Sequence, residues 1–331
     1  MKKSSIFIFL ILFALNLQAV TLLDLGFQTR AVGMGNAFSA LCDDSSTIYY
    51  NPALLYHIEK HQVSIGYSHL FLTANNFNLS YIYPKLLLKP DVGVSIGISS
   101  LFDSDIKTYL PVSYGEPGDY TTGDNFNFYE NLFIIGGGAK IKNIWMMQIS
   151  GGVSIKYFNR GLENIKSNGF GFDIGVNVKH KLFNFAIVIK NILGRLYSES
   201  KISSSDIKED IPITLRTGTL LRIKRIIRKI FKPVEKRPSV DSFNRSSQYL
   251  NYEINPVIDT EFVFDKKFRF NIFTGIEGWL NNLIALRCGY NNLQGLSCGG
   301  SVNISQIRVD YSYSIHSELE GTHKITGTYY F

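Results

Sequence analysis

Long hydrophobic runs are nearly absent from this 331-residue sequence, and the single one lies close to its start. Residues 6–17 are apolar except for Asn16. This run is too short for a membrane-spanning helix, which needs ~20 residues. Lys2 and Lys3 precede the run and Leu17-Gln18-Ala19 ends it, the pattern of a cleaved secretory leader over residues 1–19. No Cys follows the cleavage site, so a lipid anchor is not predicted. A secreted soluble protein or a membrane β-barrel remains.

Cysteine is scarce and the common catalytic motifs are missing. Three Cys are too few, and odd in number, for a disulfide scaffold. Cys42 has no evident partner, whereas Cys288 and Cys298 fall on neighbouring predicted strands, as either a disulfide or two separate lipid-facing thiols. The six His lack metal-ligand spacing, and no Gly-x-Ser-x-Gly, His-Glu-x-x-His or phosphate-loop pattern occurs. We therefore predict no metal, no cofactor and no enzymatic activity.

Charge is low and unevenly placed. Only 18% of residues are charged, and the net charge of +7 is matched by residues 222–237, which hold eight Lys or Arg and one Glu. The remaining mature chain is slightly acidic, which argues against nucleic-acid binding. Residues 221–232 place Ile and Phe on one helical face and Lys and Arg on the other. They predict either an amphipathic helix on a membrane surface or a disordered charged turn.

Aromatic residues are plentiful at 14%, and apolar residues alternate with small or polar ones along many segments. In residues 170–178, for example, Phe, Ile and Val alternate with Gly, Asp and Asn. This period of two is typical of strands with two different faces. A soluble sandwich with apolar faces turned inward gives the same pattern. Because the polar face is rich in Gly and Ser rather than Lys and Glu, a lipid-facing barrel is favoured.

We predict an all-β fold, a 14-stranded antiparallel transmembrane β-barrel over residues 59–331, with a basic periplasmic insertion at 222–254. The predicted strands are 61–72, 76–85, 92–109, 127–141, 146–162, 170–180, 185–197, 211–222, 255–265, 267–280, 283–290, 296–304, 306–316 and 322–331. An even number returns the last strand to the side of the first. Phe331, preceded by Tyr329 on the same face, fits the terminal strand that the barrel-assembly machinery uses for insertion.

Fourteen strands enclose a lumen too wide for the wall's own side chains to fill. We expect residues 20–58 to fill it as an N-terminal hatch. Gly33 and Gly35 permit close backbone approach. Asp43 or Asp44 is predicted to cap a helix over 45–50, and Asn51 with Pro52 predicts a second capped helix. The alternative is an ordinary N-terminal loop and helix of a soluble domain.

This stretch carries a resemblance. GMGNAFSALCDD followed by NPALL resembles the N-terminal signature of the FadL-type outer-membrane superfamily, nearest its PorV/PorQ-like branch. Residues 151–176, 275–300 and 322–331 are also similar to that branch, whereas 221–252 and Cys42 depart from it. The resemblance implies a bacterial outer-membrane barrel closed by an internal hatch.

Several residues are predicted to face the lumen with a charge: Lys156, Asp173, Lys179, Arg269, Glu277, Arg287, Arg308 and Asp310. Unpaired buried charge is costly, so we expect them to pair with one another; they could also grip Asp43 and Asp44 of the hatch or contact a ligand head group. Gly136-Gly137-Gly138 predicts either a kink that opens the wall sideways or packing room for the hatch.

The resemblance implies passive uptake of hydrophobic small molecules such as long-chain fatty acids, captured at the outer mouth and released past the hatch or through a gap in the wall. The alternative is a PorV-like component of type IX secretion, whose outer loops bind exported cargo. An outer-membrane hydrolase is disfavoured because no nucleophile constellation occurs. The expected partners are outer-membrane lipids, a hydrophobic ligand, the barrel-assembly machinery and, in the alternative, cargo proteins.

Overall fold

The computed structural model describes residues 22, 25–41, 43–70, 73–86, 91–107, 109–111, 120–123, 125–163, 165–200, 207–223, 252–315 and 321–331. The predicted leader, Cys42 and nearly all of the basic insertion with its amphipathic segment lie outside these residues.

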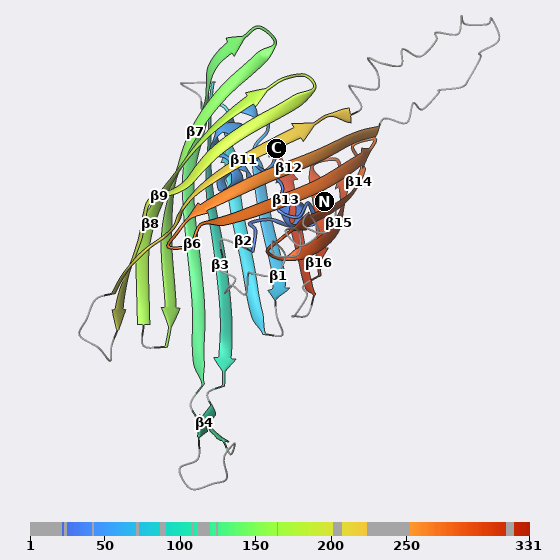
Figure 1. Cartoon of the computed structure of the whole chain (residues 1–331). Coiled ribbons are helices and arrows are strands. Elements are labelled where there is room, and N and C mark those ends of the chain that lie inside the picture. Colours follow the sequence, from blue (N-terminus) through green and yellow to red (C-terminus); the bar gives the residue numbers. More distant parts are fainter. Residues whose placement is uncertain are drawn as a thin grey trace, which may run out of the picture.

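Fourteen strands close into a barrel in chain order, each antiparallel to its neighbours (Figure 1). They are β1 (Gln62–Leu70), β2 (Ala74–Tyr83), β3 (Val92–Ile106), β6 (Phe126–Ile144), β7 (Met147–Leu162), β8 (Ile165–Lys179), β9 (Phe183–Ser200), β11 (Ile213–Leu221), β12 (Tyr252–Phe264), β13 (Arg269–Leu280), β14 (Ile284–Asn291), β15 (Gly295–Ile304), β16 (Ile307–Ser314) and β17 (Thr322–Tyr330). Pairing of β17 with β1 closes the wall. The predicted 14-stranded barrel is confirmed.

Three short strands lie outside this ring. β4 (Tyr109–Pro111) and β5 (Tyr120–Thr122) form a separate hairpin between β3 and β6, and β10 (Ile207–Asp210) pairs only with β9. We call the end of the barrel beyond which the β4–β5 hairpin lies the hairpin end. The opposite end, where His61 and Phe331 exchange backbone hydrogen bonds, is the terminal end. β12 begins at Tyr252, so the predicted insertion ends earlier than residue 254.

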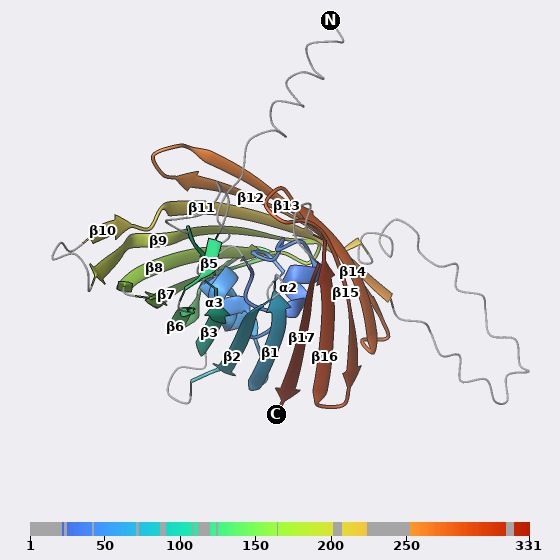
Figure 2. The same cartoon turned by 90° about the horizontal axis from the view of Figure 1, so that it is seen from below.

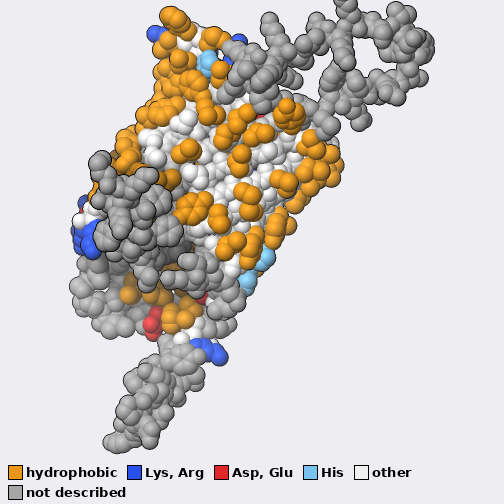
Figure 3. Space-filling view, turned by 45° about the vertical axis from the view of Figure 1, so that its right-hand side comes forward, with side chains coloured by type: hydrophobic (Ala, Val, Ile, Leu, Met, Phe, Trp, Pro, Cys, Tyr) orange, Lys and Arg blue, Asp and Glu red, His pale blue; other side chains and the backbone are white. Residues whose placement is uncertain are grey.

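The two faces of the wall differ as the alternation predicts. Along β8, Phe170 and Ile174 are 55% and 47% exposed, whereas the intervening Asp173 is fully buried. On the face of the wall that Figure 3 shows, hydrophobic side chains are spread widely with few charges between them. An apolar exterior around a closed wall is the arrangement of outer-membrane barrels, so the soluble sandwich is wrong. No helix among the described residues is long and apolar enough to cross a membrane.

Aromatic side chains gather near both ends of the wall. At the terminal end Phe331 stacks on His61 and Tyr329, with ring centroids 5.2 and 5.7 Å apart. At the hairpin end Tyr313 packs against His323 at 4.8 Å. Such aromatic girdles mark the membrane interfaces of barrels. The role of Tyr329 and Phe331 in insertion remains a prediction.

Residues 22, 25–41 and 43–58, which we call the hatch, lie inside the ring of strands (Figure 2). They contain α2 (Thr29–Gly33), α3 (Thr47–Tyr50) and the 3₁₀ helix η1 (Pro52–His57). The Asn51 side chain accepts a hydrogen bond from the Ala53 N–H at 3.1 Å, and Pro52 takes the first position of η1, as predicted. The reading of this stretch as part of a soluble domain is wrong.

The other predicted cap is wrong in detail. α3 begins at Thr47 rather than at residue 45, with Ser46 in the N-cap position. The Asp44 carboxylate instead accepts from the Ser46 N–H at 3.0 Å, within the turn that precedes the helix. Asp43 is exposed and contacts an arginine, so neither aspartate caps the helix.

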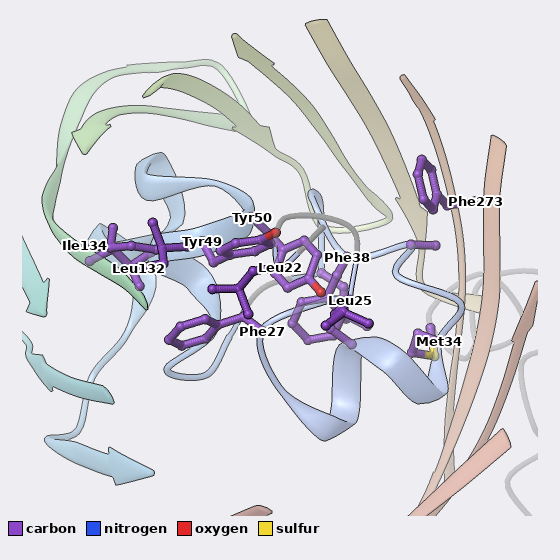
Figure 4. Close-up of a cluster of buried hydrophobic side chains, with 14 of the residues drawn as sticks. Leu22, Leu25, Phe27, Met34, Phe38, Tyr49, Tyr50, Leu132, Ile134 and Phe273 are labelled. Atoms are coloured by element: carbon purple, nitrogen blue, oxygen red, sulfur yellow. The ribbon is translucent and has the colours of Figure 1, made fainter. Parts of the chain in front are cut away.

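The hydrophobic core of the molecule lies between the hatch and the inner wall. Phe27 stacks on Tyr49 at 5.5 Å, and Tyr49 meets Tyr50 edge-on at 5.0 Å. Leu132, Ile134 and Phe273 of the wall complete the cluster (Figure 4). The hatch therefore supplies the apolar interior that a fourteen-stranded wall cannot make for itself.

Glycine allows the hatch backbone to touch the wall. Gly35 has a φ of +62°, and a Cβ there would lie 2.5 Å from the Tyr290 backbone nitrogen. A Cβ on Gly138 would lie 2.3 Å from the Pro52 carbonyl oxygen. Gly136–Gly138 pair in unbroken register with β3 and β7, so they do not open the wall, and of the three it is Gly138 that provides packing room for the hatch.

Cys288 and Cys298 lie directly opposite each other on the lipid face, with their Sγ atoms 3.0 Å apart. Facing positions on neighbouring strands bring Cβ atoms within the range that a disulfide needs. We expect this pair to oxidise to a disulfide in an oxidising compartment. Mass spectrometry after alkylation should show both thiols blocked from alkylation until a reductant is added. Full alkylation of both without reductant would contradict this expectation.

Candidate functional site

Six buried charged side chains form a closed ring where the hatch meets β13, β14 and β16. Arginines and carboxylates alternate in the order Arg30, Glu277, Arg287, Asp310, Arg308 and Asp44. Successive nitrogen–oxygen distances around the ring are 2.7, 3.3, 3.1, 2.9, 3.0 and 3.3 Å. Three positive and three negative charges compensate one another, which is the condition under which buried ions are tolerated. We call this set the charge ring.

The hatch contributes Arg30 and Asp44 to the charge ring. Arg30 donates two hydrogen bonds to Glu277, from Nε at 2.8 Å and Nη2 at 2.7 Å. Its guanidinium also lies 5.3 Å from the ring centroid of Phe38 and 5.9 Å from that of Trp279. A bidentate, stacked geometry of this kind is specific to arginine. Arg30 is therefore the main ionic attachment of the hatch to the wall.

Asp44 and Arg30 of the hatch are both ionised at neutral pH. Burial alone would raise the pKa of Asp44, but Arg308 and Arg30 outweigh it and lower the value to about 2. Burial would lower the pKa of Arg30, yet Asp43 and Glu277 hold it well above its ordinary value. Asp44 thus contributes stability that is complete above about pH 4 and is lost as the pH falls towards 2.

A second attachment lies on β12. One oxygen of Asp259 accepts hydrogen bonds from the backbone N–H groups of Phe38 and Ser39 at 3.0 and 2.9 Å, and from Arg216 Nε at 3.1 Å. Arg216 also donates to the Asn36 carbonyl. The Asp259 carboxylate of the wall thus accepts hydrogen bonds from two backbone N–H groups of the hatch that lie outside its helices.

The remaining predicted lumen charges do not hold the hatch carboxylates. Lys156 pairs with Asp173 at 2.6 Å across β7 and β8. Arg269 lies 3.9 Å from Asp265 at the hairpin end, away from Asp43 and Asp44. Lys179 lies near His57 at the terminal end. The expected mutual pairing therefore holds for Lys156 with Asp173 and for the four predicted wall charges of the charge ring. Arg308 is the predicted charge that also reaches Asp44.

The largest irregularity of the described wall lies in the middle of β9. Smaller register shifts occur between β3 and β6 near residues 103–106 and between β6 and β7 near residues 140–142. Two register shifts occur against β8, each adding one residue to β9, and both Asn191 and Leu193 have positive φ values, 58° and 54°. The Asp173 carboxylate accepts from the Asn191 N–H at 2.9 Å. On the other side β11 pairs with β9 only as far as Lys190, because it begins after Pro212, which has no N–H. We call residues 191–194 the β9 bulge.

Cavities lie on both sides of the hatch. The hairpin-side cavity has a volume of about 230 Å³ and is lined by apolar and charged side chains, among them Tyr49, Tyr50, Lys190, Asn191 and Pro212. It therefore borders the β9 bulge. The terminal-side cavity, about 240 Å³, is polar and is lined by Arg30, Asp43, Trp279 and Arg308 among others. Arg30 and Arg308 of the charge ring line this second cavity, and no member of the charge ring lines the first.

His57 makes the anchoring of η1 sensitive to pH. Burial and the nearby cations Lys179 and Arg222 lower the pKa of His57 to about 3. A released hatch takes up a proton near pH 6.5, whereas the packed one does not until near pH 3. Each pH unit below 6.5 therefore favours release by up to about 1.4 kcal/mol, and the loss ends near pH 3.

We expect hydrogen exchange of residues 52–58 to accelerate between pH 7 and pH 5 after correction for the intrinsic rate. In a His57→Gln variant this dependence should disappear, because the amide keeps a polar group near Ser150 without titrating. Equal pH dependence in both proteins would contradict the role of His57.

Sequence reasoning misses Arg30, Arg216, Asp259 and Lys190. A pattern exists for Arg216 and Lys190, since each is the single charged residue at an inward position of its strand, whereas Asp259 shares the inward face of β12 with Glu253 and Glu261. Among the described residues no group of three or more His, Cys, Asp or Glu could hold a metal ion.

No protein-family model and no curated sequence matches this chain. Solved structures match it over nearly its whole length. The Ralstonia pickettii toluene transporter TbuX aligns with 92% of this chain and 98% of its own, at a TM-score of 0.55 and 12% identity. The CymD monoaromatic hydrocarbon channel aligns with 93% and 98%, at a TM-score of 0.56 and 12% identity. A Pseudomonas aeruginosa FadL homologue aligns with 91% and 98%, at a TM-score of 0.52 and 9% identity.

These similarities establish a shared fold, a closed 14-stranded antiparallel barrel. TbuX is a transporter and CymD a channel by their own descriptions. The narrower likeness to the PorV/PorQ-like branch is not among the findings.

Proposed function

We propose that this chain is an outer-membrane channel for the passive uptake of hydrophobic small molecules, in the class of long-chain fatty acids and simple hydrocarbons. The observation that carries the proposal is the position of the hairpin-side cavity. It lies between a hatch held by buried ion pairs and the β9 bulge, where two residues are added to the wall, whereas the register shifts against β6 add one residue each. The similar fold of hydrocarbon channels supports the same reading.

The path of the transported molecule can be inferred from the contacts that hold the hatch and the β9 bulge in place. Displacing the hatch would break the charge ring and the Asp259 attachment, and each broken buried pair costs about 3–5 kcal/mol. Moving the β9 bulge would break hydrogen bonds, among them Asn191 N–H to Asp173 and Ile211 N–H to the Gly194 carbonyl, but no ion pair, since residues 191–194 carry no charge. A hydrophobic molecule therefore enters from the hairpin end and leaves sideways into the bilayer past the β9 bulge, with the hatch in place.

Two variants test this route with opposite expectations. Deleting Asn191 and Leu193 removes one extra residue from each register shift and keeps the alternation of β9. We expect it to abolish uptake of labelled toluene and of a labelled long-chain fatty acid by cells that lack their own channels. The second variant, Ser45→Cys with Ser64→Cys, joins the hatch to β1, since these Oγ atoms are 2.6 Å apart. It is built with Cys42, Cys288 and Cys298 replaced by Ser.

We expect the cross-linked hatch to leave uptake unchanged, with or without reductant, and the single Ser45→Cys variant serves as its control. Uptake that survives the deletion and stops on cross-linking would place the path beneath the hatch and overturn the lateral route. No uptake above that of cells without the protein would overturn the proposed function itself. The type IX secretion alternative gains no support from the channel structures reported above.

A further inference from the structure

One buried cation in the hairpin-side cavity has no anionic partner. Lys190 is 7% exposed, and within the described part of the chain its ammonium makes no ion pair and no hydrogen bond. Its recorded contacts are the ring faces of Tyr49 and Tyr50, at 5.0 and 5.5 Å. Figure 4 shows these two rings in the centre of the hatch cluster.

The other buried cations of this cavity are paired. Lys156 is bound by Asp173 at 2.6 Å, and Arg216 by Asp259 at 3.0 Å and Glu261 at 3.4 Å. The carboxylates nearest to Lys190 are therefore already taken by other cations. A buried ammonium without a counter-ion is costly, and contact with an aromatic face offsets only about 0.5–2 kcal/mol. Lys190 is thus the buried cation of this cavity that no carboxylate contacts directly, although Arg216 holds two carboxylates nearby.

The residues that line the cavity indicate the size and the aromatic character of the ligand. Tyr49, Tyr50, Phe158 and Phe273 present aromatic surface to the cavity, and Asn191 and Thr214 present polar groups beside Lys190. An apolar cavity of ~150 Å³ suffices for benzene, so about 230 Å³ admits one substituted aromatic ring. A long alkyl chain would not be enclosed.

We propose that the hairpin-side cavity binds an aromatic monocarboxylate, with its carboxylate on the Lys190 ammonium and its ring against Tyr49 and Tyr50. This inference rests on the proposed entry of small molecules into the cavity and narrows their class. The proposed ligand differs from the neutral hydrocarbons named in the descriptions of the similar channels. A neutral aromatic ring would leave the Lys190 ammonium without a negatively charged partner.

Binding to the purified full-length barrel in detergent tests this directly, with benzoate, toluene and benzylamine as probes in titration calorimetry. Lys190→Met keeps the stem and removes the charge, Lys190→Arg keeps the charge, and Lys166→Met removes an exposed lysine outside the cavity. We expect benzoate to bind wild type, Lys190→Arg and Lys166→Met, and to bind Lys190→Met at least about tenfold more weakly. Toluene should bind wild type and Lys190→Met alike, which also shows that the variant is folded.

Benzoate affinity that does not change in Lys190→Met would overturn the proposal, as would benzoate binding no more tightly than toluene or benzylamine to wild type. Because this measurement does not depend on transport, it separates the two proposals. Toluene uptake that requires the β9 bulge, together with absent benzoate binding, would remove only the carboxylate site. Benzoate binding without any uptake would remove only the transport role.

Discussion

Replacing Arg30 by Met should release the hatch from the barrel wall without unfolding the barrel. The substitution leaves Glu277 and Asp44 buried with one cation fewer each, and breaking a buried pair costs about 3–5 kcal/mol. Met retains apolar bulk between Phe38 and Trp279, so the loss is mainly electrostatic. We expect hydrogen exchange across residues 25–58 to accelerate by at least about a hundredfold, while exchange in β6–β8 stays slow.

The matched control is Arg195→Met. Arg195 also pairs with a carboxylate at 2.7 Å, but the pair is exposed, at 51% and 75% of the two side chains. Water and salt already screen such a pair, so no measurable change in hatch exchange is expected. A second comparison, Arg30→Lys, keeps the charge but loses the bidentate geometry and should fall between wild type and Arg30→Met. Wild-type protection of the hatch in Arg30→Met would show that the charge ring does not hold it.

Replacing Gly289 by Val should push the hatch away from β14 and open the lumen to ions. An ideal Cβ at Gly289 would lie 2.1 Å from the Gly35 nitrogen and from the Met34 carbonyl carbon. These are backbone atoms, which cannot rotate away, so the clash must displace the segment as a whole. Overpacking of this kind typically costs about 1–3 kcal/mol, with larger side chains at the upper end. We expect a steady conductance in planar bilayers where the wild type conducts little.

Gly327→Val is the control for this prediction. Gly327 lies on the lipid face of β17, and nothing stands within 4 Å of an ideal Cβ there. The same chemical change in the same kind of strand should therefore leave the conductance at the wild-type level. Equal conductance of the two variants, whether low or high, would disprove the argument that Gly289 is required for contact with the hatch.

The two variants probe different parts of the same attachment. Arg30→Met weakens ionic contacts and keeps the shape of the interface, whereas Gly289→Val keeps every charge and changes the shape. The lateral route under the proposed function requires an intact hatch. Neither variant should therefore increase uptake of toluene beyond wild type, even where ion conductance rises.

The barrel could be predicted from sequence because its signal is local. Successive strand side chains point to opposite faces, so the pattern of Phe170 to Val176 already separates a lipid side from a lumen side. The need for a hatch followed from the strand count alone, because a fourteen-stranded lumen cannot be filled by its wall. Asn51 and Pro52 marked a helix start through their own backbone preferences, which also act over a few residues. The tertiary structure had to correct the cap expected from Asp44, whose carboxylate is drawn to arginines elsewhere in the chain.

Only the tertiary structure decided which charges meet. Arg30 and Glu277 are 247 residues apart, and Asp44 and Arg308 are 264 apart, so no local pattern joins them. The sequence showed inward-facing charges, but their partners depend on strand order, register and the depth of the hatch. The β9 bulge and the unpaired Lys190 depend on the same three-dimensional register, since a shift of one residue changes what each side chain faces. Alternation thus determined the wall, and long-range register determined the hatch attachments and the cavity.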